Sequence, residues 1–228
     1  YNLYLHIYIF TYLHIYIFTY LHIYTFTYLH KKKLILLYLF TYYYNYNFKN
    51  SMTIYFYGQN IPYGYFSNHY RCEFEISSNI IGIDNSIQVY SSEQAMMWLK
   101  ALIMKDYKMA KIIESIVDPR DAKKAGRNIS NFNEELWIQW REIVMCEILK
   151  QKFSRPDLQK LLLDTKNEII AEAAPNDNIW GIGISVVQGQ NNYPWKGKNL
   201  LGKCLMHVRS ELNEKLKEKI TLSKRQRC

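Results

Sequence analysis

The stretch SSEQAMMWLKAL, residues 91–102, has the pattern of a largely buried helix around which a domain can fold. Ser91 or Ser92 can cap its start, and an acid such as Glu93 is favoured in the first turn. Glu93 and Lys100 are seven residues apart, so they lie on one stripe of the helix, about 20° from each other. A helix-start acid and a lysine stem packed on the core would explain both charges. The alternative, that both face a ligand, needs support from elsewhere in the chain.

Shorter patterns on both sides of this helix indicate the fold class. Strands are predicted at 52–60, 72–76, 87–90 and 168–174, and helices from 118 onward, over 134–152, over 155–165 and over 199–216. The first three strands suggest a small sheet ahead of the helix. We therefore expect a predominantly helical α+β domain over residues 52–218, followed by a basic tail at 219–228.

Charge and cysteine content exclude several classes of protein. The net charge of +9 falls to +5 without residues 1–51, so the domain tolerates nucleic acid without requiring it. No CxxC or HxxxH pattern occurs, so we predict neither a disulfide framework, nor a metal site, nor a cofactor, and we expect a reducing, cytoplasmic compartment. The four cysteines are far apart, and two of them, Cys146 and Cys204, fit small core positions.

The first 51 residues differ in kind from the rest. YLHIYIFT at 4–11 recurs at 12–19 and, as YLHIYTFT, at 20–27. Residues 4–29 lack formal charge, but Tyr, His and Thr are unfavourable at a bilayer centre, so membrane association is not expected. We hypothesise that this low-complexity octapeptide segment is non-native or disordered, and that the functional protein begins at Met52.

A long loop at 175–198 is rich in Gly, Asn and Pro, and loops of this length are usually functional. Its second half places Gly197, Lys198 and Asn199 at the start of a helix, where phosphates often bind. Gly126 and Arg127 follow another helix and offer a second phosphate site. Taken singly, such residues are more often ordinary caps and turns.

Five segments, taken together, resemble one family: YFSNHY (65–70), YSSEQAMMWLKAL (90–102), AGRN (125–128), NDNIWGIGIS (176–185) and GKNLLGKCLMHVRSEL (197–212). This array is similar to that of the NADAR family of YbiA-like N-glycosidases, over residues 53–212. The resemblance implies a hydrolase of N-glycosyl bonds to ribose. It implies substrates such as ADP-ribose on guanine in nucleic acid or phosphoribosylamino intermediates of riboflavin synthesis. The alternative is a non-catalytic module that binds ADP-ribose or another NAD derivative, which we would expect to lack Glu93 or Lys100.

The resemblance also suggests the site. Breaking a ribosyl C–N bond develops positive charge on the sugar, and the base needs a proton. Glu93 is expected to hold or deliver a proton, Lys100 to attack as a neutral amine or act as a cation, and Asp177 to orient ribose hydroxyls. The ligand-binding residues implied are Phe66, Ser67, Asn68, Gly126, Arg127, Asn176, Trp180, Gly181, Gly197, Lys198 and Asn199, with Phe66 and Trp180 stacking on a base.

Other aromatic and imidazole side chains receive structural interpretations. Trp137 and Trp140 fall on the apolar face of a helix and are expected in the core. His69 and His207 have no evident partner in the sequence, so we expect them to be structural or on the surface. The stretch 186–196 is longer than in compact family members and is expected to influence which substrate is selected. Partners are thus predicted to be an ADP-ribose-containing or phosphoribosyl substrate, nucleic acid only as a modified substrate, and no membrane for residues 52–228.

Overall fold

A computed structural model of the chain describes residues 52–225, without the side chain of Lys224. Residues 52–228 form a unit by themselves, and it is this unit that is described below. The octapeptide segment, the excluded membrane span at 4–29 and the last residues of the basic tail lie outside the described residues. The hypotheses about them stay predictions.

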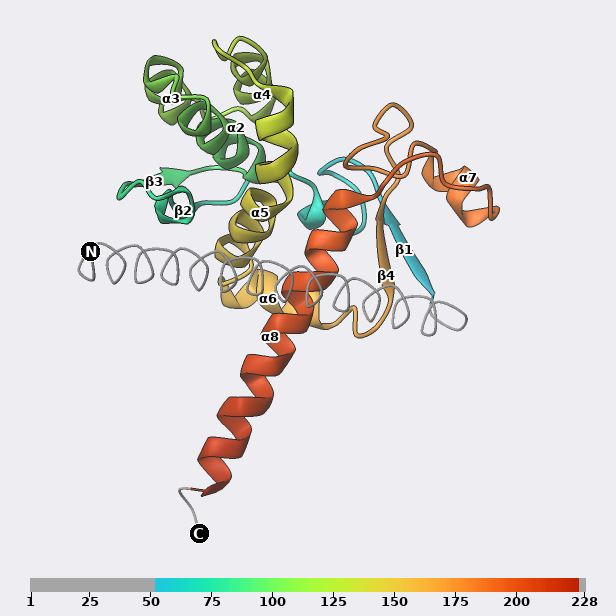
Figure 1. Ribbon diagram of the computed structural model, residues 1–228. Coiled ribbons are helices and arrows are strands. Elements are labelled where there is room, and N and C mark those ends of the chain that lie inside the picture. Colours follow the sequence, from blue (N-terminus) through green and yellow to red (C-terminus); the bar gives the residue numbers. More distant parts are fainter. Residues whose placement is uncertain (1–51, 226–228) are drawn as a thin grey trace, which may run out of the picture. The chain divides into compact units, whose positions relative to one another are not determined.

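In Figure 1, helix α2 (Ser92–Ile103) lies beside α3 (Tyr107–Glu114) and α4 (Pro119–Arg127). The side chain of Ser91 accepts a hydrogen bond from the backbone N–H of Gln94, which confirms the predicted cap. Every residue from Ser92 to Leu99 is buried. The helix packs against α3, α4 and α5 (Glu134–Lys152). A helix buried on all sides has to pair or aim its polar groups, which makes the charges of α2 informative.

The strands form two separate pairs rather than one sheet. β2 (Phe74–Ser77) and β3 (Ser86–Val89) are antiparallel neighbours ahead of α2, as expected. β1 (Thr53–Phe56) instead pairs in parallel with β4 (Ile169–Glu172), with Phe56 opposite Glu172. The prediction that the first three strands share a sheet is therefore wrong. The cause is a long-range pairing that no local pattern encodes, and it brings the end of β4 beside the turn that follows β1.

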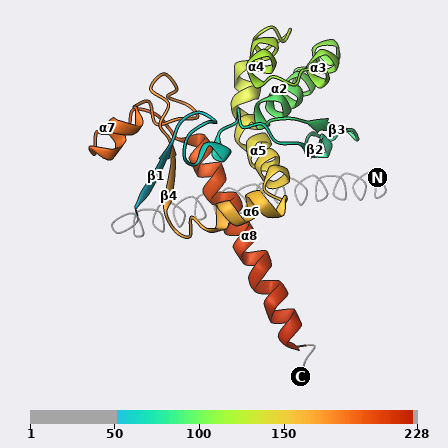
Figure 2. The ribbon, with the colours of Figure 1, turned by 180° about the vertical axis from the view of Figure 1, so that it is seen from behind.

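The remaining helices complete an α+β domain dominated by helices, which confirms the predicted fold class. These are α6 (Pro156–Leu163), the short α7 (Val186–Gln190) and α8 (Leu200–Arg225). Helix α8 packs on α5 and β4, and its C-terminal half extends beyond the other elements (Figure 2). Thus the segment predicted as a basic tail from residue 219 begins inside a helix. Within residues 52–225, no helix is long and apolar enough to cross a membrane.

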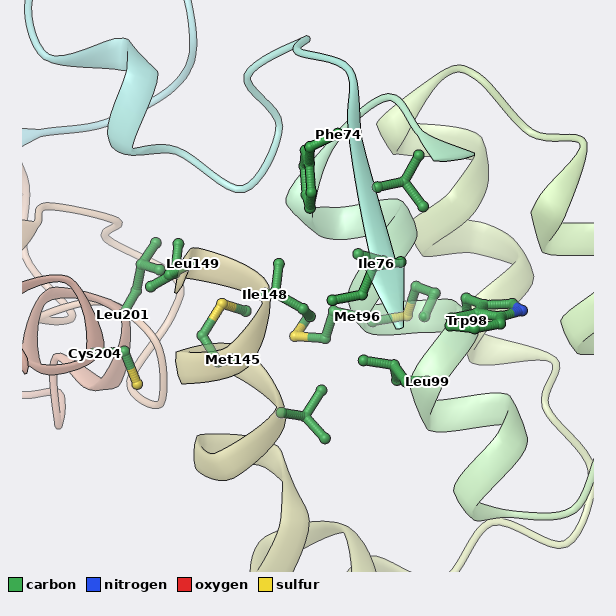
Figure 3. Close-up of a cluster of buried hydrophobic side chains, with 14 of the residues drawn as sticks. Phe74, Ile76, Met96, Trp98, Leu99, Met145, Ile148, Leu149, Leu201 and Cys204 are labelled. Atoms are coloured by element: carbon green, nitrogen blue, oxygen red, sulfur yellow. The ribbon is translucent and has the colours of Figure 1, made fainter. Parts of the chain in front are cut away.

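The core lies on both sides of α5 (Figure 3). Its buried side chains contact those of α8 on one side and those of α2 and β2 on the other; the labelled members are Met145, Ile148, Leu149, Leu201, Cys204, Met96, Trp98, Leu99, Phe74 and Ile76. The predicted core cysteines fit this picture, since Cys204 is buried and Cys146 partly buried, both as free thiols. Deleting buried methylene groups here would cost on the order of 1 kcal/mol each.

The loop predicted to be structureless at 175–198 contains helix α7, which begins with a capping box formed by Ser185 and Gln188. The loop also folds back on β4, because the N–H of Ile182 donates to the carbonyl of Glu172 at 2.8 Å. A small apolar cluster of Ala171, Ala173, Ile182 and Ile184 lies beneath it. The two halves of the loop are therefore held at the end of β4.

Candidate active site

A cavity of about 260 Å³ lies where α2, α4 and the first turns of α5 meet the end of β4. Glu93 and Lys100 both line it, so the stripe that carries the two charges faces a cavity rather than the core. The other predicted residues that line it are Asn68, Gly126, Arg127, Asp177 and Trp180. Segments far apart in the sequence thus meet around one space of the size of a sugar.

Glu93 is buried at 2% exposure, and its Oε1 has no hydrogen-bond partner among the described residues. Its backbone N–H donates to the carbonyl of Asn68, which ties the start of α2 to the turn that carries Asn68 and His69. Burial raises the pKa of Glu93; Asp177 adds to this effect, and Lys123 opposes it. The carboxyl group is therefore predisposed to hold a proton.

Lys100 is half-buried, and burial lowers the pKa of its amine, while Glu93 opposes that shift. Its Nζ donates to the carbonyl oxygen of Gly126 at 3.0 Å and lies 4.4 Å from the ring centre of Phe132. A Cβ on Gly126 would lie 1.9 Å from Sδ of Met97. Glycine at this position therefore lets α4 approach α2 closely enough to hold the amine at the cavity.

Asp177 begins the turn that carries Trp180. Its Oδ1 accepts hydrogen bonds from the backbone N–H groups of Ile179 and Trp180, at 2.9 and 2.8 Å. This Asx turn fixes the carboxylate at the cavity wall and brings the half-buried indole of Trp180 to the same wall. A Cβ on Gly181 would lie 2.9 Å from the carbonyl oxygen of Glu172, so glycine allows the loop to approach β4.

Glu172 was not identified from the sequence, although it lines the same cavity. It is the last residue of β4, and its Oε2 is buried without a partner among residues 52–225. Burial, with a contribution from Asp177, raises the pKa of Glu172 to about 8 against the attraction of Lys123. The available signal was a carboxylate inside an apolar run, EIIAEAA at 168–174. Lys123 of α4 was also missed.

The two histidines differ in outcome: His207 is exposed on α8, as expected, whereas His69 lies in the candidate site. Nε2 of His69 lies 3.7 Å from Oε2 of Glu93, and His69 lines the cavity. Burial, together with Lys123, lowers the pKa of His69, which favours a neutral imidazole. His207 also has a partner, because its Nε2 lies 3.1 Å from Oε1 of Glu211. These partners come from tertiary packing and from the turn of α8, which is why residue type alone did not reveal them.

Among the aromatic residues, Phe66 departs from its predicted role. Phe66 is fully buried and packs against Phe56 and Phe153, with ring centres 5.6 and 6.1 Å apart, so it is not available to stack on a base. Trp137 packs against the core, as expected, and also lines the cavity. Trp140 is partly buried and packs on the core, in line with the prediction.

The predicted phosphate site at the start of α8 is not formed. The backbone N–H groups of residues 198–201 donate to the carbonyls of residues 178–181, so these amides are already used. The Asn199 side chain is buried, donates to the carbonyl of Ile170 and accepts from the N–H of Glu172, which makes it a structural residue. Gly197 is packed against the carbonyl of Gly181. Lys198 is exposed and lines neither the 260 Å³ cavity nor the second cavity described below.

A second, larger cavity of about 550 Å³ adjoins the first. The predicted residues Ser67 and Asn176 line this one instead. The two cavities share four lining residues: His69, Lys123, Glu172 and Asp177. In the described part of the chain, no group of three His, Cys, Asp or Glu side chains is arranged to hold a metal ion.

Comparison with known proteins agrees with this arrangement. The family described as NADAR domain matches residues 55–213. N-glycosidase R617 of Acanthamoeba polyphaga mimivirus is 44% identical over 124 residues, which cover 53% of this chain and 73% of that protein. The chloroplastic riboflavin biosynthesis protein PYRR of Arabidopsis thaliana is 35% identical over 112 residues, 47% of this chain and 17% of that protein.

A solved structure is similar as well. The NMR structure of the E. coli protein YbiA superposes with a TM-score of 0.59 at 30% identity, covering 73% of this chain and 89% of that chain. The family match includes every residue that lines the two cavities, from Tyr57 to Trp180. The chain belongs to the NADAR domain family.

Proposed function

We propose that this chain is an N-glycosidase that hydrolyses the C–N bond between a ribose and a base. The observation that carries the proposal is a set of three buried oxygens without hydrogen-bond partners in the described chain: Asn68 Oδ1, Glu93 Oε1 and Glu172 Oε2. All three residues line the 260 Å³ cavity. Buried acceptors left unpaired cost about 1–3 kcal/mol each, so a ligand that supplies donors is favoured. Ribose supplies hydroxyl donors.

The charges around the cavity fit the chemistry of such a bond. Its cleavage develops positive charge at the anomeric carbon, which nearby carboxylates stabilise. In the proposed reaction the Lys100 amine attacks the anomeric carbon, and the electron pair of the broken bond goes to the base. Glu93 lies close enough to affect the charge of Lys100 and accepts the proton that the amine loses. Glu93 then returns this proton to the lysyl nitrogen, and water attacks the anomeric carbon, which breaks the bond to the lysine and restores the amine.

The substrate class is the finer part of the proposal. Lys123 and Arg127 of α4 line the cavity and offer cations to a phosphate on the sugar. We therefore propose a phosphorylated ribosyl substrate, either ADP-ribose on guanine in nucleic acid or a phosphoribosylamino pyrimidine of the riboflavin type. The name of the plant riboflavin protein supports the second class, and the name of the viral N-glycosidase supports only the kind of bond that is cleaved.

A base-release assay tests the function. ADP-ribosylated guanine in DNA and a phosphoribosylamino pyrimidine are offered side by side to the wild-type chain and to Lys100→Ala. The matched control is Lys108→Ala, because Lys108 is exposed on α3 and lines neither cavity. Release from one substrate that is lost in Lys100→Ala and kept in Lys108→Ala establishes the activity and its substrate class. Binding of ADP-ribose without release from either substrate would instead identify a binding module.

A further inference from the structure

The end of β4 separates two cavities that differ in the side chains that line them. The smaller cavity carries Lys100 and Arg127. The larger is lined by residues 57–61, the turn after β1, together with Ser67, Arg120, Ala174 and Asn176. Three of its side chains, those of Gln59, Asn60 and Asn176, are amides, which offer both donors and acceptors. Mixed donors and acceptors match the edge of a nucleobase better than they match a phosphate, which accepts only.

Glu172 lies on the wall shared by the two cavities and is held there through its backbone. Its N–H donates to Oδ1 of Asn199 at 3.1 Å, and its carbonyl accepts from the N–H of Ile182 at 2.8 Å. Its side-chain Oε2 is buried without a partner in residues 52–225. A rigid strand end thus presents a free carboxyl oxygen at the boundary between the two spaces.

An N-glycoside has the same division, since a sugar and a base lie on either side of the bond that breaks. We propose that the leaving base occupies the larger cavity and that Glu172 is the general acid that protonates it. As the C–N bond breaks, its electron pair stays on the base nitrogen and takes the proton of the Glu172 carboxyl group. The water that later attacks the anomeric carbon returns a proton to the Glu172 carboxylate. This assignment rests on the proposed N-glycosidase function.

The other carboxyl groups of the site fit the role less well. Glu93 lines the smaller cavity and not the larger one, so it faces the sugar. Asp177 lines both, but its Oδ1 already accepts two backbone N–H groups. Burial keeps the pKa of Glu172 near 8, so its carboxyl holds a proton at neutral pH. The charged and titratable groups that line the same two cavities are Tyr57, His69, Glu93, Lys100, Arg120, Lys123, Arg127 and Asp177.

The pH dependence of kcat/KM tests the role of Glu172. For the wild type we expect activity on the substrate identified above to fall above about pH 8, as the acid loses its proton. Glu172→Gln should lower kcat/KM by about 10²- to 10⁴-fold and abolish that alkaline limb. Glu172→Asp should keep the limb at a reduced rate, and the exposed control Glu73→Gln should match the wild type.

The outcomes separate the two proposals. Wild-type release with the alkaline limb intact in Glu172→Gln overturns the assignment of Glu172 alone. Substrate binding without release by the wild type overturns the proposed function and this assignment together.

The position of the base has its own test in Asn60→Ala, because the Asn60 side chain is exposed at the larger cavity. This change should raise KM several-fold and leave unchanged the affinity for ADP-ribose, which lacks the leaving base. An unchanged KM places the leaving base elsewhere.

Discussion

The buried carboxyl of Glu172 should lower the stability of the protein at the pH at which it works. Its pKa rises from 4.5 to about 8 on folding, so the folded state binds this proton more tightly than the unfolded state does. The stabilisation that comes from this tighter proton binding is therefore fully present below about pH 4.5 and is lost as the pH rises towards 8. Each pH unit above 4.5 removes about 1.4 kcal/mol of unfolding free energy, so the loss of stability is roughly 3 kcal/mol at pH 7 and roughly 5 kcal/mol above pH 8.

Glu172→Gln removes this titration while keeping the shape of the side chain. We expect it to be more stable than the wild type by up to roughly 3 kcal/mol at pH 7, with the advantage growing to pH 8 and vanishing near pH 4.5. Urea unfolding at pH 4.5, 6, 7 and 8.5 measures it, with exposed Glu73→Gln as the control. A difference in unfolding free energy that is constant across this range would refute the reasoning, because only a shifted pKa makes it depend on pH.

Four further results are expected. A lysyl sugar can open its ring to an imine, so borohydride added during turnover should reduce that imine and trap the sugar on Lys100. Absence of an adduct with full loss of activity in Lys100→Ala would make the lysine an electrostatic group. Gly126→Ala should lower the unfolding free energy by about 1–3 kcal/mol and reduce kcat/KM. The same change made in a Met97→Ala background should cost less, because Met97→Ala has already removed the sulfur that the new Cβ meets. Asn199→Ala should cost roughly 2–4 kcal/mol in urea unfolding, since it removes two hydrogen bonds to β4 and Asn199 has a φ of 53° that alanine disfavours. Burial lowers the pKa of Lys152 from 10.5 to about 8, so folding disfavours the charged form of this side chain. Lys152→Met should therefore have a higher free energy of unfolding than the wild type below pH 8. This difference should disappear as the pH rises towards 10.5.

Much of the helical framework follows from local rules. The Ser91 cap, the proline at the start of α4 and the apolar spacing of α5 and α8 each depend on residues within one or two turns. The same local geometry predicts that Glu93 and Lys100 share a stripe. It does not say whether that stripe meets core or cavity, because that depends on what packs against α2.

The predicted ligand residues that proved structural fail for a common reason. Residue type suggested that Phe66 and Asn199 bind ligand, but each is buried by segments distant in the sequence. The amides at the start of α8 looked free in the sequence and are taken up by the carbonyls of residues 178–181. A cap or a hydrogen bond supplied from another segment leaves no trace in the local pattern.

The sequence by itself determined the class of the domain, its family, and the pairing of one acid with one amine on helix α2, because periodicity and short motifs are properties of neighbouring residues. Only the tertiary structure decided that Glu172 belongs to the site, through the parallel pairing of β1 with β4 and the return of the loop onto β4. It also decided that His69 lies beside Glu93, and that Glu93 and Glu172 each have a buried carboxyl oxygen. The chemistry of a carboxyl group depends on its solvent exposure and nearby charges, and these are set by residues that meet only when the chain has folded.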